Sequence, residues 1–398
     1  MAKLSIDDLN LKGKNIFVRV DFNVPLDEDQ LITDDLRIKS ALPSILKIIN
    51  DGGRAVLASH LGRPKGEKKS EFSLKPVASH LSRLINKNVV FVEDCIGSSA
   101  SEQKKNLKDG DVLLLENLRF YKGETSNDDT FAGQLASDCD IYINDAFGTA
   151  HRAHASTHGI TKYFKQCAAG YLMQRELQFL GKALERPERP FVSILGGAKI
   201  SGKIDVIENL LGKTDALLLG GGMIFTFYKV QGLEIGKSIL EAERLKMASD
   251  ILEKAKSSST KFYLPSDVMV ADKFETGAQT KMVNSDAIPA DWFGVDIGIK
   301  TISTFKDVLA PAKTIVWNGP MGVFEIPDFS NGTEEIARYL ADLTDKDATT
   351  IVGGGDSAAA VKKFKLEGRL SHVSTGGGAS LEFLEGKILP GVDVLTDK

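Results

Sequence analysis

The sequence is poor in the residues that mark disulfide-bonded, secreted or membrane-spanning proteins. Its 398 residues include three cysteines, which are far apart and form no C-x-x-C pair. This usage predicts reduced thiols in a cytoplasmic protein. No run of 18 apolar residues occurs, and the first residues, "MAKLSIDDLN", lack an apolar signal core. Neither a membrane span nor a secretory signal is therefore expected.

A strong net charge is also lacking. The formal charge is −4, from 50 basic and 54 acidic side chains. Such a balance predicts no general nucleic-acid or membrane partner, so any anionic ligand has to be held by local positive groups. Apolar content of 42% and charged content of 26% are typical of a globular protein. The length predicts two domains rather than one.

Short runs rich in Val, Ile and Leu alternate with helical patterns along the whole chain. Examples are "NIFVRVDF", "DVLLLENLRF", "PFVSILGG" and "TIVWNGP", separated by stretches such as "LRIKSALPSILKIIN" and "ILEAERLKMASDILEKAK". "KFYLPSDVMV" is also expected to be one strand. Continuous apolar runs suit strands buried on both faces, so the alternation predicts two tandem α/β units with parallel sheets and helices on both sides. The amphipathic stretch "GYLMQRELQFLGKALERPERP" is expected to be a connecting helix that stops before its prolines.

In the first half, the predicted strands end in cationic and polar side chains. "RVDFNVP" places Arg19, Asp21 and Asn23 at alternate positions, on one side of the chain. Later strand ends carry His60, Arg63, Arg119 and Arg152, and Arg37 opens the first helix. Ligands of open α/β sheets lie beyond the carboxyl ends of the strands. The set therefore predicts a site for a carboxylate or phosphate, although each arginine alone is more typical of a surface ion pair.

Three of the six histidines fall in "NDAFGTAHRAHAST" and the residue that follows it. The spacing of His151, His154 and His158 raises the question of a zinc site. No cysteine accompanies them, and Arg152 lies in their middle, where a guanidinium disfavours a bound cation. The anion-binding interpretation is preferred, and His154 and His158 remain open to a purely structural role.

In the second half, the strands end in glycine. Three GGG turns occur (Gly220–Gly222, Gly353–Gly355 and Gly376–Gly378), and glycine lets phosphate oxygens approach the backbone at a helix start. "GAKISGKI" is nearly a phosphate-binding P-loop, but Ile204 replaces the hydroxyl residue that binds Mg²⁺. Lys199 and Lys203 are then candidate phosphate ligands, and Asp356 of "GGGDS" is the candidate metal ligand.

One half suited to a small organic anion and another suited to a phosphate chain predict phosphoryl transfer. Such transfer depends on positioning and on charge neutralisation, and an acceptor that is already a carboxylate needs no base. A dinucleotide-dependent dehydrogenase is an alternative, but no G-x-G-x-x-G fingerprint follows a strand. A non-catalytic anion-binding protein with a hinge is another, and it would leave Lys203 and Asp356 without a role.

Nine motifs together resemble those of the phosphoglycerate kinase family, in order and across nearly the whole chain. They are "RVDFNVP", "SHLGRPKG", "LLENLRF", "NDAFGTAHRAHAST", "ILGGAKISGKI", "GGGMIFTF", "WNGPMGVFE", "GGGDS" and "STGGGASLEFLEGK". The resemblance implies a cytoplasmic, monomeric glycolytic kinase with two Rossmann-like three-layer α/β domains joined by a hinge helix. It implies a phosphoglycerate-binding domain over 1–170 that the tail 386–398 rejoins, a connecting helix over 171–185, and a nucleotide domain over 186–385.

The resemblance also implies roles for individual residues. Those expected to bind 3-phosphoglycerate or 1,3-bisphosphoglycerate are Asp21, Asn23, Arg37, His60, Arg63, Arg119, His151 and Arg152. Those expected to contact ATP or ADP are Lys199, Lys203, Gly221, Asn318, Glu325, Gly354, Gly355, Asp356 and Ser357, with Asp356 holding Mg²⁺. Those expected to stabilise the phosphoryl group in flight are Arg37, Lys203, Gly376 and Gly377. Ser357 stands where the family usually has Thr, and Gly202 is also less usual.

Overall fold

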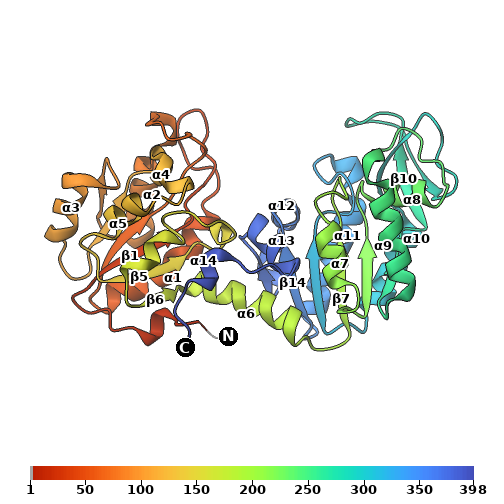
Figure 1. Ribbon diagram of the computed structural model, residues 1–398. Helices are drawn as coiled ribbons and strands as arrows, with labels where there is room; N and C mark the ends of the chain where they lie inside the picture. Colours follow the sequence, from red (N-terminus) through yellow and green to blue (C-terminus); the bar gives the residue numbers. More distant parts are fainter. Residues whose placement is uncertain (1–2) are drawn as a thin grey trace. The chain divides into compact units, whose positions relative to one another are not determined.

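The structure, a computed structural model, describes residues 3–398 (Figure 1). The chain divides into two compact units. The first contains the residues up to Leu177 together with Ile388–Lys398, and the second is Gln178–Lys387. Helix α6 (Tyr171–Glu185) contains the boundary, so the chain passes from one unit to the other within a helix. Among residues 3–398 no helix has the length and apolar character needed to cross a membrane.

The first unit is built on a parallel sheet of six strands in the order β3-β4-β2-β1-β5-β6. The strands are β1 (Asn15–Val20), β2 (Arg54–Ala58), β3 (Val89–Val92), β4 (Val112–Leu115), β5 (Ile141–Asp145) and β6 (Cys167–Ala169). The helices of the unit, besides the first half of α6, are α1 (Leu36–Asn50), α2 (Lys75–Ile85), α3 (Gly97–Asn106), α4 (Lys122–Thr125), α5 (Asp129–Ala136) and α14 (Pro390–Asp393). Short 3₁₀ helices are η1 (Ile6–Asp8), η2 (Ser70–Phe72), η3 (Leu118–Phe120), η4 (Phe147–Thr149) and η5 (Gly159–Tyr163).

Helix α1 shows how the sequence pattern produces the core of this unit. Ile38, Ala41, Ile45 and Ile48 recur every three or four residues and are all buried. That spacing places them on one face of a helix, against the apolar side chains of the sheet. The prediction of a helix over "LRIKSALPSILKIIN" is confirmed, and Arg37 lies in its first turn.

The C-terminal segment packs on the same unit near the end of β5. The Asn144 side chain donates to the Gly391 carbonyl at 2.9 Å, and the Gly391 amide donates to the Ala150 carbonyl at 2.8 Å. The Thr396 amide donates to the Cys167 carbonyl at 2.9 Å. The tail therefore buttresses the loop that carries His151 and Arg152.

The second unit contains a parallel sheet of six strands in the order β15-β14-β13-β7-β8-β9. The strands are β7 (Phe191–Leu195), β8 (Ala216–Leu219), β9 (Lys261–Tyr263), β13 (Thr314–Asn318), β14 (Thr349–Gly353) and β15 (His372–Val373). The helices are α7 (Ile204–Leu210), α8 (Ile224–Val230), α9 (Leu245–Ser257), α10 (Ile299–Leu309), α11 (Asn331–Thr344), α12 (Gly355–Lys363) and α13 (Gly378–Leu384). Short 3₁₀ helices are η6 (Ala242–Arg244), η7 (Pro327–Phe329) and η8 (Glu367–Arg369).

A second, antiparallel sheet in this unit was not predicted. It contains β10 (Asp267–Ala271), β11 (Thr280–Asn284) and β12 (Phe293–Ile297), in the order β11-β10-β12. The expectation of one strand over "KFYLPSDVMV" is wrong, because the chain leaves β9 before Pro265 and starts β10 after it. Proline lacks the amide hydrogen that would continue a sheet ladder, so the two halves join different sheets.

Both parallel sheets have a position where the chain reverses its direction of progress across the sheet. In the second unit it lies between β7 and β13, and in the first it lies between β1 and β5. Loops that follow such a pair of strands run to opposite sides and leave a crevice at the carboxyl ends, which is where ligands of open α/β sheets bind. The fold therefore directs attention to the segments after these four strands.

Gly319 shows how closely the backbones meet at the crevice of the second unit. Its φ is +97°, and an added Cβ would lie 2.2 Å from the Gly196 carbonyl oxygen. We predict that Gly319→Ala destabilises the protein by about 2–3 kcal/mol, because strain and overlap add. Urea unfolding followed by circular dichroism measures the change.

Gly202→Ala is the matched control, since a Cβ there meets no atom within 4 Å and its φ lies outside the left-handed region. It should leave stability unchanged or raise it by about 0.4–1 kcal/mol. Equal unfolding midpoints for the two variants would contradict the proposed crowding at Gly319.

Candidate functional site

Three loops of the first unit are tied together at the carboxyl edge of its sheet. Arg37 donates to the Asn23 carbonyl at 2.8 Å and lies 3.4 Å from the Asp21 carboxylate. The Asn23 side-chain oxygen accepts from the Gly62 amide at 2.8 Å, and Arg119 donates to the Gly62 carbonyl at 2.8 Å. Loops after β1, β2 and β4 therefore converge, as the sequence predicted from their positions at strand ends.

The positive groups at this edge of the sheet are close enough to lower one another's pKa. Burial, followed by repulsion from Arg19 and Arg152, lowers the pKa of Arg119 to about 10. Burial and then the neighbouring arginines Arg19, Arg119 and Arg37 hold the pKa of His60 well below its usual range. The arginines outnumber the nearby carboxylates Asp21 and Glu124. Such an excess of cations favours an anionic ligand, because the charge of the ligand relieves their repulsion.

Arg63, His151 and Arg152 extend this cluster toward solvent. Arg63 and Arg152 are exposed, and the Arg152 side chain donates to His151 Nε2 at 3.0 Å. Burial, then Arg152, lowers the pKa of His151. His151 is thus held as a neutral ring beside a guanidinium. Asp21, Asn23, Arg37, His60, Arg63, Arg119, His151 and Arg152 are the residues that we call the basic cluster.

The other two histidines of the motif, His154 and His158, contact neighbouring protein side chains. His154 is buried, with Nδ1 3.8 Å from the Glu124 carboxylate, and burial lowers its pKa to about 4. His158 contacts the Asn127 side chain at 3.3 Å. Within residues 3–398 no group of three His, Cys, Asp or Glu side chains has an arrangement that could hold a metal ion.

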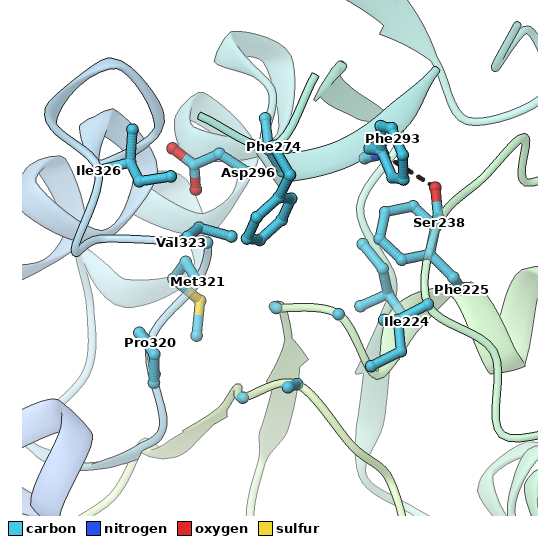
Figure 2. A pocket seen from close by; sticks show the side chains of 18 of the residues that line it. Ile224, Phe225, Ser238, Phe274, Phe293, Asp296, Pro320, Met321, Val323 and Ile326 are labelled. Atoms are coloured by element: carbon cyan, nitrogen blue, oxygen red, sulfur yellow. Dashed lines mark hydrogen bonds between the residues drawn. The ribbon is translucent and has the colours of Figure 1, made fainter. Parts of the chain in front are cut away.

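The second unit has two neighbouring cavities at the switch point between β7 and β13. The larger, of about 620 Å³, has mostly apolar walls, and the smaller, of about 220 Å³, is lined largely by glycine. Figure 2 shows Ile224, Phe225 and Phe293 on one side of the larger cavity and Pro320, Met321 and Val323 on the other. Asp356 and Gly197 line both cavities, so one extended ligand can occupy the two.

Lys203 is the cation of the smaller cavity. Its ammonium group donates to the side-chain oxygen of Asn318, and burial lowers its pKa to about 8. Gly354 has a φ of +90° and precedes α12, whose first amides have no partner within the helix. The Ser357 hydroxyl accepts from the Gly319 amide at 2.6 Å and so joins this helix start to the end of β13. A lysine beside an open helix N-terminus is an arrangement that binds phosphate.

Most of the predicted residues of the second half line these cavities, but not all. Gly221, Glu325 and Asp356 line the larger one. Lys203, Asn318, Gly354, Gly355, Asp356, Ser357 and Gly377 line the smaller one. Gly376, which precedes Gly377 in the chain, is buried and lines neither cavity, and its amide donates to the Ser374 hydroxyl at 3.1 Å. Lys199 is exposed on the loop after β7 and lines neither cavity.

Sequence reasoning missed the apolar walls of the larger cavity. Phe225, Ile239, Phe293 and Met321 come from four segments that are far apart in the chain. Phe293 belongs to the antiparallel sheet, whose pairing has no short sequence signal here. The motifs "GGGMIFTF" and "WNGPMGVFE" contain Phe225 and Met321, but an apolar residue beside a glycine turn is equally typical of helix packing.

A cation cluster on one α/β unit and a phosphate-type cavity joined to an apolar cavity on another define a two-domain kinase. The family model for phosphoglycerate kinase matches residues 6–387. The chain belongs to the phosphoglycerate kinase family, and it is a phosphotransferase of glycolysis.

Relatives of this family match the chain from end to end. The chain is 56% identical over 397 residues to phosphoglycerate kinase of Chloroherpeton thalassium, with 100% of both chains covered. It is 55% identical to the cytosolic phosphoglycerate kinase of Triticum aestivum, covering 99% of this chain and 98% of that one. The solved phosphoglycerate kinase of Coxiella burnetii has a TM-score of 0.89 at 46% identity, with 98% of each chain covered. Two parallel-sheet α/β domains are thus a property of the family, and the dehydrogenase and non-catalytic alternatives are set aside.

Asp296 is a buried carboxyl group at the wall of the larger cavity (Figure 2). It accepts from the Ile297 amide at 2.9 Å and from the Gly332 amide at 2.5 Å, at the start of α11. A Cβ on Gly322 would lie 2.1 Å from Asp296 Oδ1, so the backbone of the cavity wall passes close to this carboxyl group. Asp296 therefore anchors the start of α11 and leaves no room for a side chain at position 322, and burial raises the pKa of Asp296 to about 8.

We predict that Asp296 makes stability fall as pH rises. A carboxyl group whose pKa is higher in the folded state contributes stability that is complete below about pH 4 and is lost as pH approaches about 8. Between pH 6 and pH 9 the wild type should therefore lose up to about 2–3 kcal/mol relative to Asp296→Asn. Urea unfolding across this pH range measures the difference. The exposed Asp286→Asn controls for loss of one charge, and parallel pH curves for wild type and Asp296→Asn would rule the prediction out.

Proposed function

We propose that the chain transfers a phosphoryl group reversibly between 1,3-bisphosphoglycerate and ADP, giving 3-phosphoglycerate and ATP, in glycolysis and gluconeogenesis. The observation that carries the proposal is the division of the site. The basic cluster on the first unit suits a small anion with a phosphate and a carboxylate. The paired cavities on the second unit suit a nucleotide, because an apolar space opens onto a phosphate-type one.

The basic cluster is proposed to hold 3-phosphoglycerate by both its charges and its hydroxyl. Arg63, Arg119 and Arg152 have guanidinium forks that fit phosphate and carboxylate oxygens through paired hydrogen bonds. Asp21 and Asn23 supply acceptors and donors for a hydroxyl. The acceptor of the phosphoryl group is a carboxylate that is already ionised, so no general base is required.

The nucleotide is proposed to place its base in the larger cavity and its phosphates in the smaller one. Glu325 lines the larger cavity and is a candidate for the ribose hydroxyls. Lys203 would neutralise a phosphate oxygen, and the amides at Gly354 and Gly355 would donate to others. Arg37, Lys203 and the Gly376–Gly377 segment are the groups proposed to stabilise the phosphoryl group in flight.

Asp356 is the proposed ligand for Mg²⁺. It is exposed at the first turn of α12 and lines both cavities. The donor set fits Mg²⁺ bound with a nucleotide, since this ion keeps several waters and uses one or two carboxylates together with substrate phosphates. When bound, the ion neutralises charge on the transferring phosphate.

Two variants test the activity and the division of the site together. The wild type should phosphorylate 3-phosphoglycerate with Mg²⁺-ATP in an NADH-coupled assay. Arg63→Ala should weaken 3-phosphoglycerate binding about tenfold or more, since a charge-assisted hydrogen bond is lost, and should leave ADP binding intact.

Asp356→Asn should lower kcat strongly with little change in 3-phosphoglycerate binding, because an amide is a poor ligand for Mg²⁺.

Calorimetric titration of each ligand onto each variant separates these effects. No turnover by the wild type would refute the proposed reaction. Equal loss of both ligands in Arg63→Ala would refute the division of labour while leaving the reaction in place.

Transfer is further proposed to require closure of the two units about α6. Each substrate is proposed to bind its own unit, yet the reacting atoms have to approach within about 3–3.5 Å. Either ligand alone is expected to shift the equilibrium partly toward the closed form, and both together further. Closure would also exclude water from the acyl phosphate.

Small-angle scattering with no ligand, each ligand and both should show a radius of gyration that falls in that order. We propose in addition that the chain is a cytoplasmic monomer without nucleic-acid or membrane partners, in keeping with its net charge of −4. The forward scattering should then correspond to one chain of 43.1 kDa. A radius of gyration that is identical in all four samples would contradict the proposed closure of the two units.

A further inference from the structure

Arg19 is a fully buried arginine on β1 that lies beneath the basic cluster rather than within it. The sequence placed it on the same side of the chain as Asp21 and Asn23, but its exposed fraction is 0%. It therefore cannot bind the substrate directly. Burying a guanidinium is costly unless its donors are paired, so its contacts indicate its purpose.

One side of Arg19 is neutralised through a serine. Its Nε donates to the Ser156 hydroxyl at 2.7 Å, and that hydroxyl donates to Glu124 Oε1 at 2.7 Å. The Ser156 amide donates to Glu124 Oε2 at 3.0 Å. Glu124 is also fully buried. The Ser156 hydroxyl accepts a hydrogen bond from Arg19 and donates one to Glu124. Arginine can only donate, so the direction of both hydrogen bonds is fixed.

The other side of Arg19 meets the histidine of the basic cluster. Arg19 Nη2 lies 3.3 Å from His60 Nδ1. A guanidinium has five donors and no acceptor, so Nδ1 has to be the acceptor and carries no hydrogen. Asp21 is 3.9 Å from the same nitrogen, too far for a hydrogen bond that would hold a proton there. The ring proton of neutral His60 is therefore on Nε2.

We propose that Arg19 is a positioning residue that fixes the Nε2–H tautomer of His60, so that His60 donates one neutral hydrogen bond to an oxygen of the bound phosphoglycerate. Ser156 and Glu124 keep Arg19 in place for this task. The proposal rests on the function proposed above, and it adds a buried layer of three residues to the basic cluster. His60 then contributes direction and selectivity for an oxygen acceptor, while the exposed arginines contribute charge.

Selective ¹⁵N-histidine labelling and two-bond ¹H–¹⁵N spectra of the full chain test the tautomer directly. The chain has six histidines, and His60→Asn identifies the signal of His60. At pH 7.5 the wild type should show one tautomer, with Nδ1 unprotonated and Nε2 protonated. Arg19→Lys keeps the buried charge but cannot reach Ser156 and His60 together, so it should show a mixture of tautomers. Ser156→Ala should do the same to a smaller degree.

Both variants should weaken 3-phosphoglycerate binding by about tenfold and leave ADP binding unchanged. Ser193→Ala is the matched control, because Ser193 is a buried serine of the other unit whose hydroxyl has no hydrogen-bond partner in the described part of the chain. It should change neither the His60 signal nor either titration.

A wild-type spectrum with the proton on Nδ1, or an unchanged single tautomer in Arg19→Lys, overturns the inference whatever the protein binds. A single Nε2–H tautomer that responds to Arg19→Lys, in a protein that does not bind 3-phosphoglycerate, overturns the proposed function instead and leaves the role of Arg19 in setting the tautomer supported.

Discussion

Hydrogen bonding between parallel, fully buried strands is the interaction on which the rest of this molecule depends. In β1, β5, β7 and β13 every residue is buried, and the backbone polar groups are paired with neighbouring strands. Most side chains within such strands are apolar or are compensated by hydrogen bonds, because no water reaches them, and the unpaired hydroxyl of Ser193 on β7 is an exception. Polar chemistry is therefore confined to the carboxyl ends, and the reversal of strand order opens a crevice there in each unit.

The two units share this arrangement of strands but place different chemical groups at the carboxyl ends. The first presents side-chain cations, and their crowding lowers the pKa of Arg119 to about 10. The second presents backbone amides beside glycine, with Lys203 as the cation of the smaller cavity, and burial lowers the pKa of Lys203 to about 8. In both, the unliganded site holds positive charge in surroundings that disfavour it. An anion bound at either site would relieve that cost, and this relief would add to its binding free energy.

Buried ionisable groups lie behind the candidate site of each unit. Arg19 and Glu124 lie under the basic cluster, joined by Ser156. Asp296 lies behind the apolar cavity and receives the first amides of α11. Each lies behind a loop that carries a residue proposed to bind a ligand, and each is hydrogen-bonded to its neighbours. Such groups are sensitive to substitution, since removal of one partner leaves the other buried and unpaired.

The sequence by itself determined the local structure and the chemistry of the strand ends. Continuous apolar runs predicted most of the parallel strands, though not the short strands β6 and β15, and three-to-four spacing predicted α1 and α6. The residues after the strands gave the basic cluster, Lys203 and Asp356 as candidates. Only the tertiary structure decided the strand order, the antiparallel sheet, the walls of the larger cavity, the exposure of Lys199 and the burial of Arg19. The physical reason is that periodicity records how one segment is buried, whereas cavity walls and buried hydrogen-bond networks depend on contacts between segments far apart in the chain. Phe225 and Phe293 come to line one cavity, and Arg19 and Glu124 come to share Ser156, only after the strands have paired.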